Sequence, residues 1–347
     1  MQSYEDEVYL KTTKLADEII SQLPDFCRRY FTHLKGKSPR TRLQYAYDMK
    51  RFFDYIAAQP GFRETPLRSM RASEILDQMQ LEDIQEYLDT LEYQTNAEKR
   101  SSASSRARKS SSLRSFWSYY YKIGEIQRDM APLIDVPDIP QHPVIAMDGS
   151  QVQRLLDTVK SDAGLTSREM AFHSRIVQRD FAIMMTLLGT GIRVSELVGI
   201  DIDDIDFEEA SIIVKRKGGD YDEVFFPLET ETALQSYISE GRNLLSPSPE
   251  EKALFISLQH ERMSVRSVQV MVKKYSQRAG LNGKITPHKC RSTFATNVLR
   301  ETGDIRTVQT ALHHQNIQTT TKYLQTDREQ KRRAALKSAT LFQNENN

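Results

Sequence analysis

Residues 287–296 read PHKCRSTFAT, residues 312–314 read LHH and residues 319–326 read TTTKYLQT, so groups suited to phosphate chemistry are concentrated in one short stretch. His288 and Arg291 stand three residues apart and would share one face of a helix. His314 follows a short apolar turn, and Tyr323 lies further on in a Thr-rich run. The stretch therefore predicts a helix that presents part of a phosphate-directed site.

A tyrosine in such a site needs help, because its unperturbed pKa of about 10 makes it a weak nucleophile at neutral pH. Attack on phosphorus requires fixed cations that stabilise both the phenolate and the phosphorane, and the planar fork of arginine suits this task. The alternative interpretation is that residues 292–299 belong to an ordinary amphipathic helix with apolar spacing.

A second cluster, far upstream, favours the functional interpretation. Residues 181–200 read FAIMMTLLGTGIRVSELVGI, and we expect an apolar helix that stops at Gly189 and Gly191 and restarts at Ser195. The break exposes Arg193 in an apolar neighbourhood, where an ordinary solvated charge is not expected.

Between the two clusters, residues 211–228 read SIIVKRKGGDYDEVFFPL. Two short β-branched or aromatic runs flank Gly218 and Gly219, which is the pattern of a β-hairpin. Lys217 would then lie at the tip of the hairpin, and Lys215 lies two residues before it.

In order and spacing, these residues resemble the tyrosine recombinase (phage integrase) family, and in particular its simple Xer-like members. The matching motifs are residues 190–197 (TGIRVSEL), Lys217-Gly218, His288-x-x-Arg291, residues 312–314 and Tyr323. They are weak singly and highly specific together, and the resemblance extends from about residue 25 to residue 330.

The chain departs from the family pattern at two places. The family usually has Leu and His where this chain has Cys290 and Ser292, and usually Gly where it has His313. None of these changes removes a catalytic position. The first two should affect packing beside Arg291, and His313 places a bulky, titratable ring where a tight turn is usual.

The resemblance implies a catalytic set, namely Arg193, Lys217, His288, Arg291, His314 and Tyr323. The two arginines would hold the scissile phosphate and Tyr323 would attack it. Lys217 would protonate the leaving oxygen, although Lys215 could replace it, and the histidines would manage the tyrosine proton and bind phosphate. Glu196, one helical step from Arg193, is interpreted as orienting that arginine rather than as a base.

The implied enzyme is a site-specific recombinase that cuts and rejoins DNA through a 3′-phosphotyrosyl intermediate, without metal or nucleotide cofactor. Its reaction would be integration, excision, inversion or dimer resolution, as in mobile elements. The implied partners are double-stranded DNA with an inverted-repeat core site and three further copies of the chain. The resulting tetramer on DNA would be joined by exchange of a C-terminal helix.

Composition sets looser limits on this chain of 347 residues, for which two domains are the natural expectation. Hydrophobic residues make up 39% and charged residues 27%, so real cores can form. A net charge of +1 neither favours nor excludes a polyanionic partner. Two distant cysteines, the absence of a secretory leader and the lack of a long apolar run favour a cytoplasmic protein with no membrane association.

The sequence predicts a mainly helical fold with one small antiparallel sheet. We expect a short lead-in at 1–24, a helical bundle at 25–130, a Pro-rich linker at 131–148 and an α+β domain at 149–347. The expected strands are near 202–207, 211–215 and 223–227, and expected helices include 151–160, 180–188, 229–240 and 265–279. By resemblance, the bundle is a SAM-like core-binding domain, and the two domains form a C-shaped DNA clamp.

Basic residues of the bundle are concentrated in residues 35–51, where Asp48 is the only acid, and in residues 100–124, which contain no acid. The predicted DNA contacts are Lys37, Arg40, Arg42, Arg106, Arg108, Lys109 and Arg114. The alternative for residues 97–109 is a solvated Ser/Arg stretch. The stripe of Trp117 and nearby tyrosines is interpreted as core rather than as a base-stacking surface.

Three other interpretations fit the sequence less well. A zinc site at His288, Cys290, His313 and His314 is not expected, because the spacings match no usual structural pattern and no carboxylate accompanies them. A non-catalytic DNA-binding protein of the same fold conflicts with the complete catalytic set. A type IB topoisomerase would use a similar set, but the basic tail DREQKRRAALKSATLFQ (residues 327–343), with apolar Leu336, Leu341 and Phe342, favours exchange between recombinase subunits.

Overall fold

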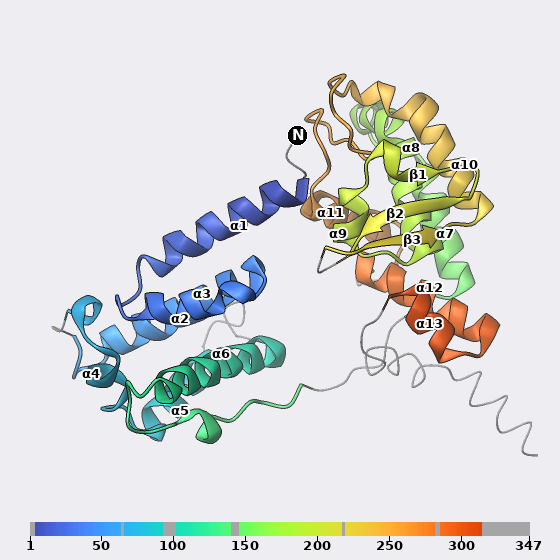
Figure 1. Cartoon of the computed structure of the whole chain (residues 1–347). Helices are drawn as coiled ribbons and strands as arrows, with labels where there is room; N and C mark the ends of the chain where they lie inside the picture. The colour runs from blue at the N-terminus through green and yellow to red at the C-terminus, as the bar shows by residue number, and fades with distance from the viewer. Residues whose placement is uncertain are drawn as a thin grey trace, which may run out of the picture. The chain divides into compact units, whose positions relative to one another are not determined.

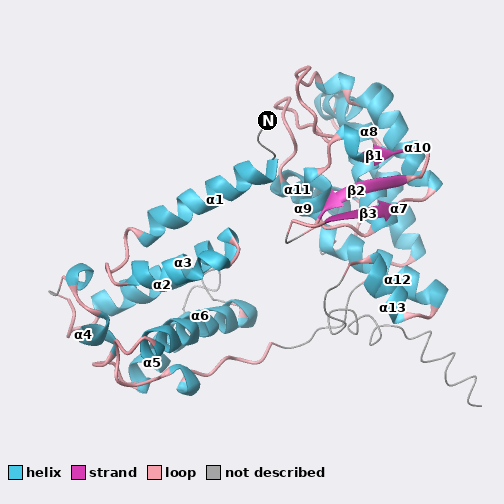
Figure 2. Ribbon diagram, in the orientation of Figure 1, coloured by secondary structure: helices cyan, strands magenta, loops and turns pink. Residues whose placement is uncertain are grey.

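The computed structural model describes residues 4–63, 66–92, 102–139, 146–216, 219–281 and 285–313. The chain forms two compact units, residues 1–141 and 142–347 (Figure 1). Helices dominate both units, and the strands of the described residues form one small sheet in the second unit (Figure 2). The predicted mainly helical fold with a small antiparallel sheet is therefore confirmed.

The first unit is a helical bundle with an aromatic core. Its helices are α1 (Tyr4–Ile20), α2 (Cys27–His33), α3 (Pro39–Ala58), α4 (Ala72–Leu76), α5 (Leu81–Glu92) and α6 (Ala103–Lys122). Phe52 makes edge-to-face contacts with Tyr87 and Trp117, with ring centroids 5.2 and 5.7 Å apart. Trp117 and Tyr120 are fully buried, so the prediction that the stripe is core is confirmed for these two residues, whereas Tyr121 is exposed.

The lead-in forms helix α1, which packs against α3 in the same unit. Ile20 and Leu23 are buried, whereas Leu15 is exposed. Helix α3 begins at Pro39, and the Ser38 side chain caps it by accepting a hydrogen bond from the Thr41 amide at 3.2 Å.

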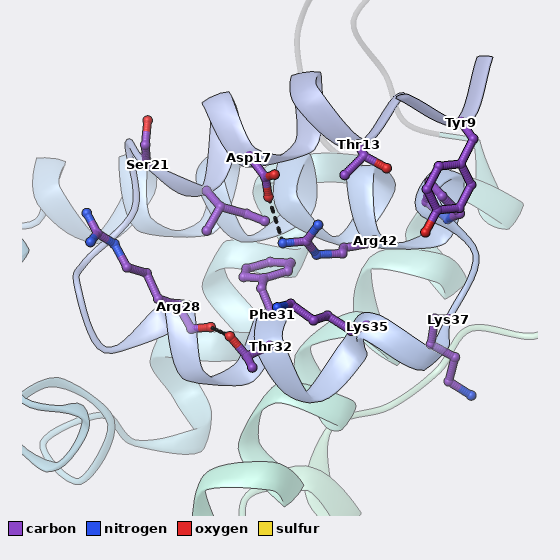
Figure 3. A pocket seen from close by; sticks show the side chains of 12 residues that line it. Tyr9, Thr13, Asp17, Ser21, Arg28, Phe31, Thr32, Lys35, Lys37 and Arg42 are labelled. Atoms are coloured by element: carbon purple, nitrogen blue, oxygen red, sulfur yellow. Dashed lines mark hydrogen bonds and ion pairs between the residues drawn. The ribbon is translucent and has the colours of Figure 1, made fainter. Parts of the chain in front are cut away.

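A pocket of about 590 Å³ lies among α1, α2 and α3 (Figure 3). Its wall includes the ion pair between Arg42 and Asp17, at 2.7 Å, together with Arg28, Lys35 and Lys37. All its lining residues belong to the first unit, so the pocket does not contain any of the predicted catalytic residues.

The Pro-rich segment is fixed at both of its described ends. Ala131–Leu133 form a short 3-10 helix that the sequence analysis did not predict, and Ala131 and Ile134 join the core of the first unit. Residues 140–145 lie outside the described part. Beyond them, the Met147 amide donates a hydrogen bond to Thr293 Oγ1 at 3.0 Å, inside the second unit.

The long helix α8 (Ser167–Thr190), whose second half is largely buried, contacts α7 (Gly149–Lys160), α10 (Leu228–Ser236) and α12 (Pro287–Thr302). The remaining helices are α9 (Val194–Gly199), α11 (Val265–Arg278) and α13 (Ile305–Ala311). Helix α8 begins earlier than expected because Thr166 and Glu169 form a capping box. The sequence analysis missed helix α13 and expected only an apolar turn there.

The sheet is antiparallel with the order β1 (Ile205–Asp206), β2 (Ser211–Lys215), β3 (Tyr221–Phe225). The β2–β3 hairpin was predicted, and its register pairs Ile212 with Val224 and Val214 with Asp222. The first strand is shorter than expected because residues 202–204 form a 3-10 turn. Among the described residues, no helix combines the length and apolar character needed to span a membrane.

Candidate active site

The break between α8 and α9 depends on Gly191. Its φ of +64° closes the end of α8, and its amide donates to the Leu187 carbonyl at 3.3 Å. A Cβ atom at this position would lie 2.3 Å from Cδ1 of Phe294 in α12. Gly191 therefore combines a left-handed turn with a close approach of α12. Gly189, by contrast, lies within α8, where Thr230 packs directly over it.

Arg193 begins helix α9 and is held by Glu196. The Arg193 amide donates to Glu196 Oε2 and the Arg193 guanidinium donates to Glu196 Oε1, both at 2.7 Å. The Glu196 side chain is only 3% exposed, whereas that of Arg193 is 39% exposed. A buried carboxylate therefore fixes the base of an arginine that still reaches solvent.

Arg291 joins three segments that are distant in sequence. Helix α12 begins at Pro287 after the Thr286 cap, which places Arg291 on its second turn. Its Nη1 donates to the Gly191 carbonyl at 2.5 Å and its Nη2 donates to the Leu312 carbonyl at 2.7 Å. Because Gly191 is two residues from Arg193, these bonds bring the two predicted arginines into one region.

The residues around Arg291 in α12 lie partly at the surface and partly in the core. His288 is exposed on the first turn, and its carbonyl accepts a hydrogen bond from Ser292 Oγ at 3.0 Å. Cys290 and Ser292 are both buried beside Arg291. Burial raises the pKa of the Cys290 thiol to about 12, so the side chain stays neutral. We expected Cys290 and Ser292 to affect packing beside Arg291, and the structure places both side chains in the interior.

His313 adopts a left-handed conformation directly after α13, with φ of +48°. Its amide donates to the Thr310 carbonyl at 2.9 Å, and its Nδ1 lies 3.3 Å from Asp222 Oδ2. Figure 1 shows that α12 and α13 lie side by side, and Leu299 and Val308 pack between them. The turn at His313 is therefore held against the helix that contains Arg291.

The sequence analysis missed Arg216, which is 4% exposed. Its Nη1 donates to Glu196 Oε2 at 2.7 Å, and its Nε and Nη2 donate to Asp222 Oδ2 at 2.9 and 2.7 Å. Strand alternation could have revealed it, because an inward Val214 implies that residue 216 also points inward. Lys215 instead points to the other face, where its Nζ lies 5.9 Å from the centre of the Tyr221 ring.

Half of the predicted catalytic set is described. Arg193, His288 and Arg291 belong to the second unit, and the structure connects Arg193 and Arg291 through Gly191. Lys217, His314 and Tyr323, like the predicted exchange tail, lie outside the described residues. In the described part of the chain, no group of three or more His, Cys, Asp or Glu side chains is arranged to hold a metal ion.

The predicted DNA contacts differ in exposure and in their partners. Lys37, Arg40 and Arg114 are exposed. Arg42 is paired with Asp17, and Arg108 is paired with the buried Asp48.

Two further members of the predicted set lie closer to the core. Arg106 is half-buried, and Lys109 is buried and donates to Ser105 Oγ at 2.7 Å. Burial lowers the pKa of the Lys109 ammonium, while burial raises the pKa of Asp48 against the opposing charge of Arg108. Part of the basic surface therefore has a role inside the bundle, where it joins α3 to α6.

Comparison with known proteins identifies the class of this chain. Residues 146–330 match the phage integrase family. The tyrosine recombinase XerC of Caldanaerobacter subterraneus subsp. tengcongensis is 31% identical over 322 residues, which cover 89% of this chain and 84% of that protein. XerC of Salmonella typhi is 33% identical over 217 residues, which cover 62% of this chain and 67% of that protein.

Solved structures agree with this match at the level of the fold. The XerH site-specific recombinase bound to a palindromic difH substrate aligns with a TM-score of 0.66 at 16% identity, covering 96% of this chain and 97% of that one. A lambda integrase dimer bound to a COC' core site aligns with a TM-score of 0.62 at 14% identity, covering 88% and 95%. The chain belongs to the phage integrase family and is a tyrosine recombinase.

The close approach at Gly191 generates a stability prediction. Gly191→Ala would force a methyl group into the Phe294 ring and a side chain onto a left-handed backbone. We expect a loss of about 2–4 kcal/mol in the free energy of unfolding, measured by urea denaturation. Gly199→Ala is the control, because no atom lies within 4 Å of its added Cβ. Equal stability of the two variants would contradict the steric role of Gly191.

Proposed function

We propose that this chain is a site-specific DNA recombinase that cuts and rejoins DNA through a covalent bond between Tyr323 and a 3′ phosphate. The observation that supports this most directly is the contact of Arg291 with the carbonyl of Gly191, which unites the two arginine segments. The family match and the XerC relatives support the same activity.

In this proposal, Arg193 and Arg291 bind the non-bridging oxygens of the scissile phosphate. Tyr323 attacks phosphorus, and the bond to the 5′ oxygen of the next nucleotide breaks. The phosphotyrosyl bond conserves the energy of the broken phosphodiester, so the free 5′ hydroxyl of a second strand can reverse the step. Because no net hydrolysis occurs, rejoining requires no nucleotide.

Three further groups manage protons and charge. Lys217, or Lys215 in its place, protonates the leaving 5′ oxygen. His288 accepts the tyrosine proton, and His314 donates a hydrogen bond to the phosphate. The exposed position of His288 on the first turn of α12 is compatible with contact to a substrate.

Both arginines are held by other groups of the protein. Glu196 fixes Arg193, and two carbonyl groups fix Arg291. Donors that are already in place need little reorganisation when charge develops on the phosphate, and this is the main source of electrostatic catalysis. The geometry therefore favours a cutting enzyme over a DNA-binding protein that only retains the fold.

We further propose that the DNA contains an inverted-repeat core site and that four copies of the chain assemble on it. The exposed Lys37 and Arg40 of the α3 segment and Arg114 of α6 would contact the phosphate backbone. The domain at 25–130 would thereby bind DNA together with the catalytic domain at 149–347. The tail beyond Tyr323 would insert into a neighbouring copy.

The nucleophile can be tested by removing one hydroxyl group. Tyr323→Phe should retain DNA binding, because the ring remains, while covalent protein–DNA adducts on a nicked suicide substrate disappear. Denaturing gels measure the adduct, and mobility shifts measure binding. Adducts that survive in Tyr323→Phe would place the nucleophile elsewhere, with the exposed Tyr221 as the first residue to test.

The basic surface can be tested by salt dependence. Replacing Lys37, Arg40 and Arg114 with Ala should weaken binding to all DNA sequences alike and flatten the log–log salt slope by roughly 0.9 per lost phosphate contact. Arg108→Ala is the comparison variant, since it should lower the free energy of unfolding by leaving Asp48 buried without its arginine. An unchanged salt slope in the triple variant would rule out these contacts.

The tail distinguishes a recombinase from a topoisomerase. Truncation after Thr326 removes Leu336, Leu341 and Phe342, each of which would contribute about 1.5–3 kcal/mol if buried in a neighbour. We expect single-subunit DNA binding to persist, while cooperative assembly on a two-arm site and strand exchange are lost.

Ser338→Ala within the full-length tail is the matched control for the truncation and should leave assembly unchanged. Cooperative assembly and full-rate recombination by the truncated protein would contradict helix exchange. Efficient relaxation of supercoiled DNA by a strictly monomeric full-length protein would instead favour the topoisomerase.

A further inference from the structure

A continuous series of polar contacts links the turn after α13 to the start of α9. At one end, His313 Nδ1 lies 3.3 Å from Asp222 Oδ2. The same oxygen accepts from Arg216 Nε and Nη2 at 2.9 and 2.7 Å. Arg216 Nη1 donates to Glu196 Oε2 at 2.7 Å, and Glu196 Oε1 accepts from Arg193 Nη1 at 2.7 Å.

The residues in the middle of this series of contacts are largely buried. The side chains of Arg216 and Glu196 are each 3% exposed, and that of Asp222 is 29% exposed. Breaking one bond of a buried arginine between two carboxylates would leave uncompensated charge, so the three groups are expected to move as one unit. Asp222 is therefore a fixed point on β3 rather than a flexible surface carboxylate.

At the other end of this series of contacts, His313 has an unusual backbone conformation. A φ of +48° directly after α13 is the position that glycine fills most easily. Histidine adopts this conformation only at some cost, and its side chain gains the contact with Asp222 in return. A glycine here, as is usual in the family, would relax the backbone and remove the contact.

The position of this contact suggests its role. His313 immediately precedes His314, and Asp222 lies on the strand that follows Lys217 in the β2–β3 hairpin. These two candidate catalytic residues come from segments that are far apart in sequence. The contact between His313 and Asp222 joins the segments, and Arg216 and Glu196 extend the connection to Arg193.

On the basis of the proposed function, we propose that His313 is a positioning residue. Its contact with Asp222 sets the turn after α13 relative to β3 and, through Arg216 and Glu196, relative to Arg193. His313 itself does not touch the reacting phosphate. Because small displacements of catalytic groups reduce rates by up to about 100-fold, loss of this contact should slow cleavage without weakening DNA binding.

Three substitutions at His313 separate this role from a purely structural one. His313→Gly removes the contact and relaxes the backbone. His313→Asn also tolerates a left-handed backbone and places an amide nitrogen at the position of Nδ1, from which it can donate to Asp222. His313→Asp places a carboxylate oxygen there, which Asp222 would repel.

The measurements are the single-turnover rate of adduct formation on a nicked suicide substrate at saturating protein, the Kd for the same DNA, and the thermal midpoint. We expect His313→Gly to form adducts about tenfold more slowly, with unchanged Kd and an equal or higher midpoint. His313→Asn should restore most of the rate, and His313→Asp should be at least as slow as His313→Gly.

Two outcomes would overturn the proposal. Adduct formation by His313→Gly at the rate of the unmodified protein would show that the contact positions nothing. Equal rates for His313→Asn and His313→Gly, with a weaker Kd in both, would show that the imidazole binds DNA directly. Failure of the proposed function is distinguishable, because the unmodified protein itself would then form no adduct.

Discussion

The second unit depends on the buried guanidinium of Arg291. It donates to the carbonyl of Gly191 at the end of α8 and to the carbonyl of Leu312 after α13, while its own backbone belongs to α12. A buried cation is stable only when such acceptors surround it. One side chain therefore determines how three segments meet. The absence of a side chain at Gly191 lets α12 come close enough for these bonds to form.

Much of this region could be predicted from the sequence because its determinants are local. A glycine break followed by Arg193 and a Gly-centred hairpin each depend on a few neighbouring residues. The predicted pairing of Arg193 with Glu196 is equally local, since three residues separate them in a helical turn. The predicted ends of helices and strands were less accurate. Helix α8, for example, begins earlier than expected, at its capping box.

Other features could not be predicted because they depend on contacts between distant segments. Arg108 was expected to face DNA, yet it reaches Asp48, which lies 60 positions earlier in the chain. Arg216 was not singled out, because its two carboxylate partners come from α9 and β3. Helix α13 has only seven residues, and its stability comes from packing on α12 rather than from its own sequence pattern.

The fixed ends of the Pro-rich segment make it a tether of defined length. Ile134 is buried in the core of the first unit, and Met147 is bonded to Thr293, two residues from Arg291 on the same helix. Thirteen peptide steps separate these anchors, so the tether can extend to at most roughly 45 Å. Because Met147 is bonded to α12, a pull along the tether would act directly on the helix that contains the buried Arg291.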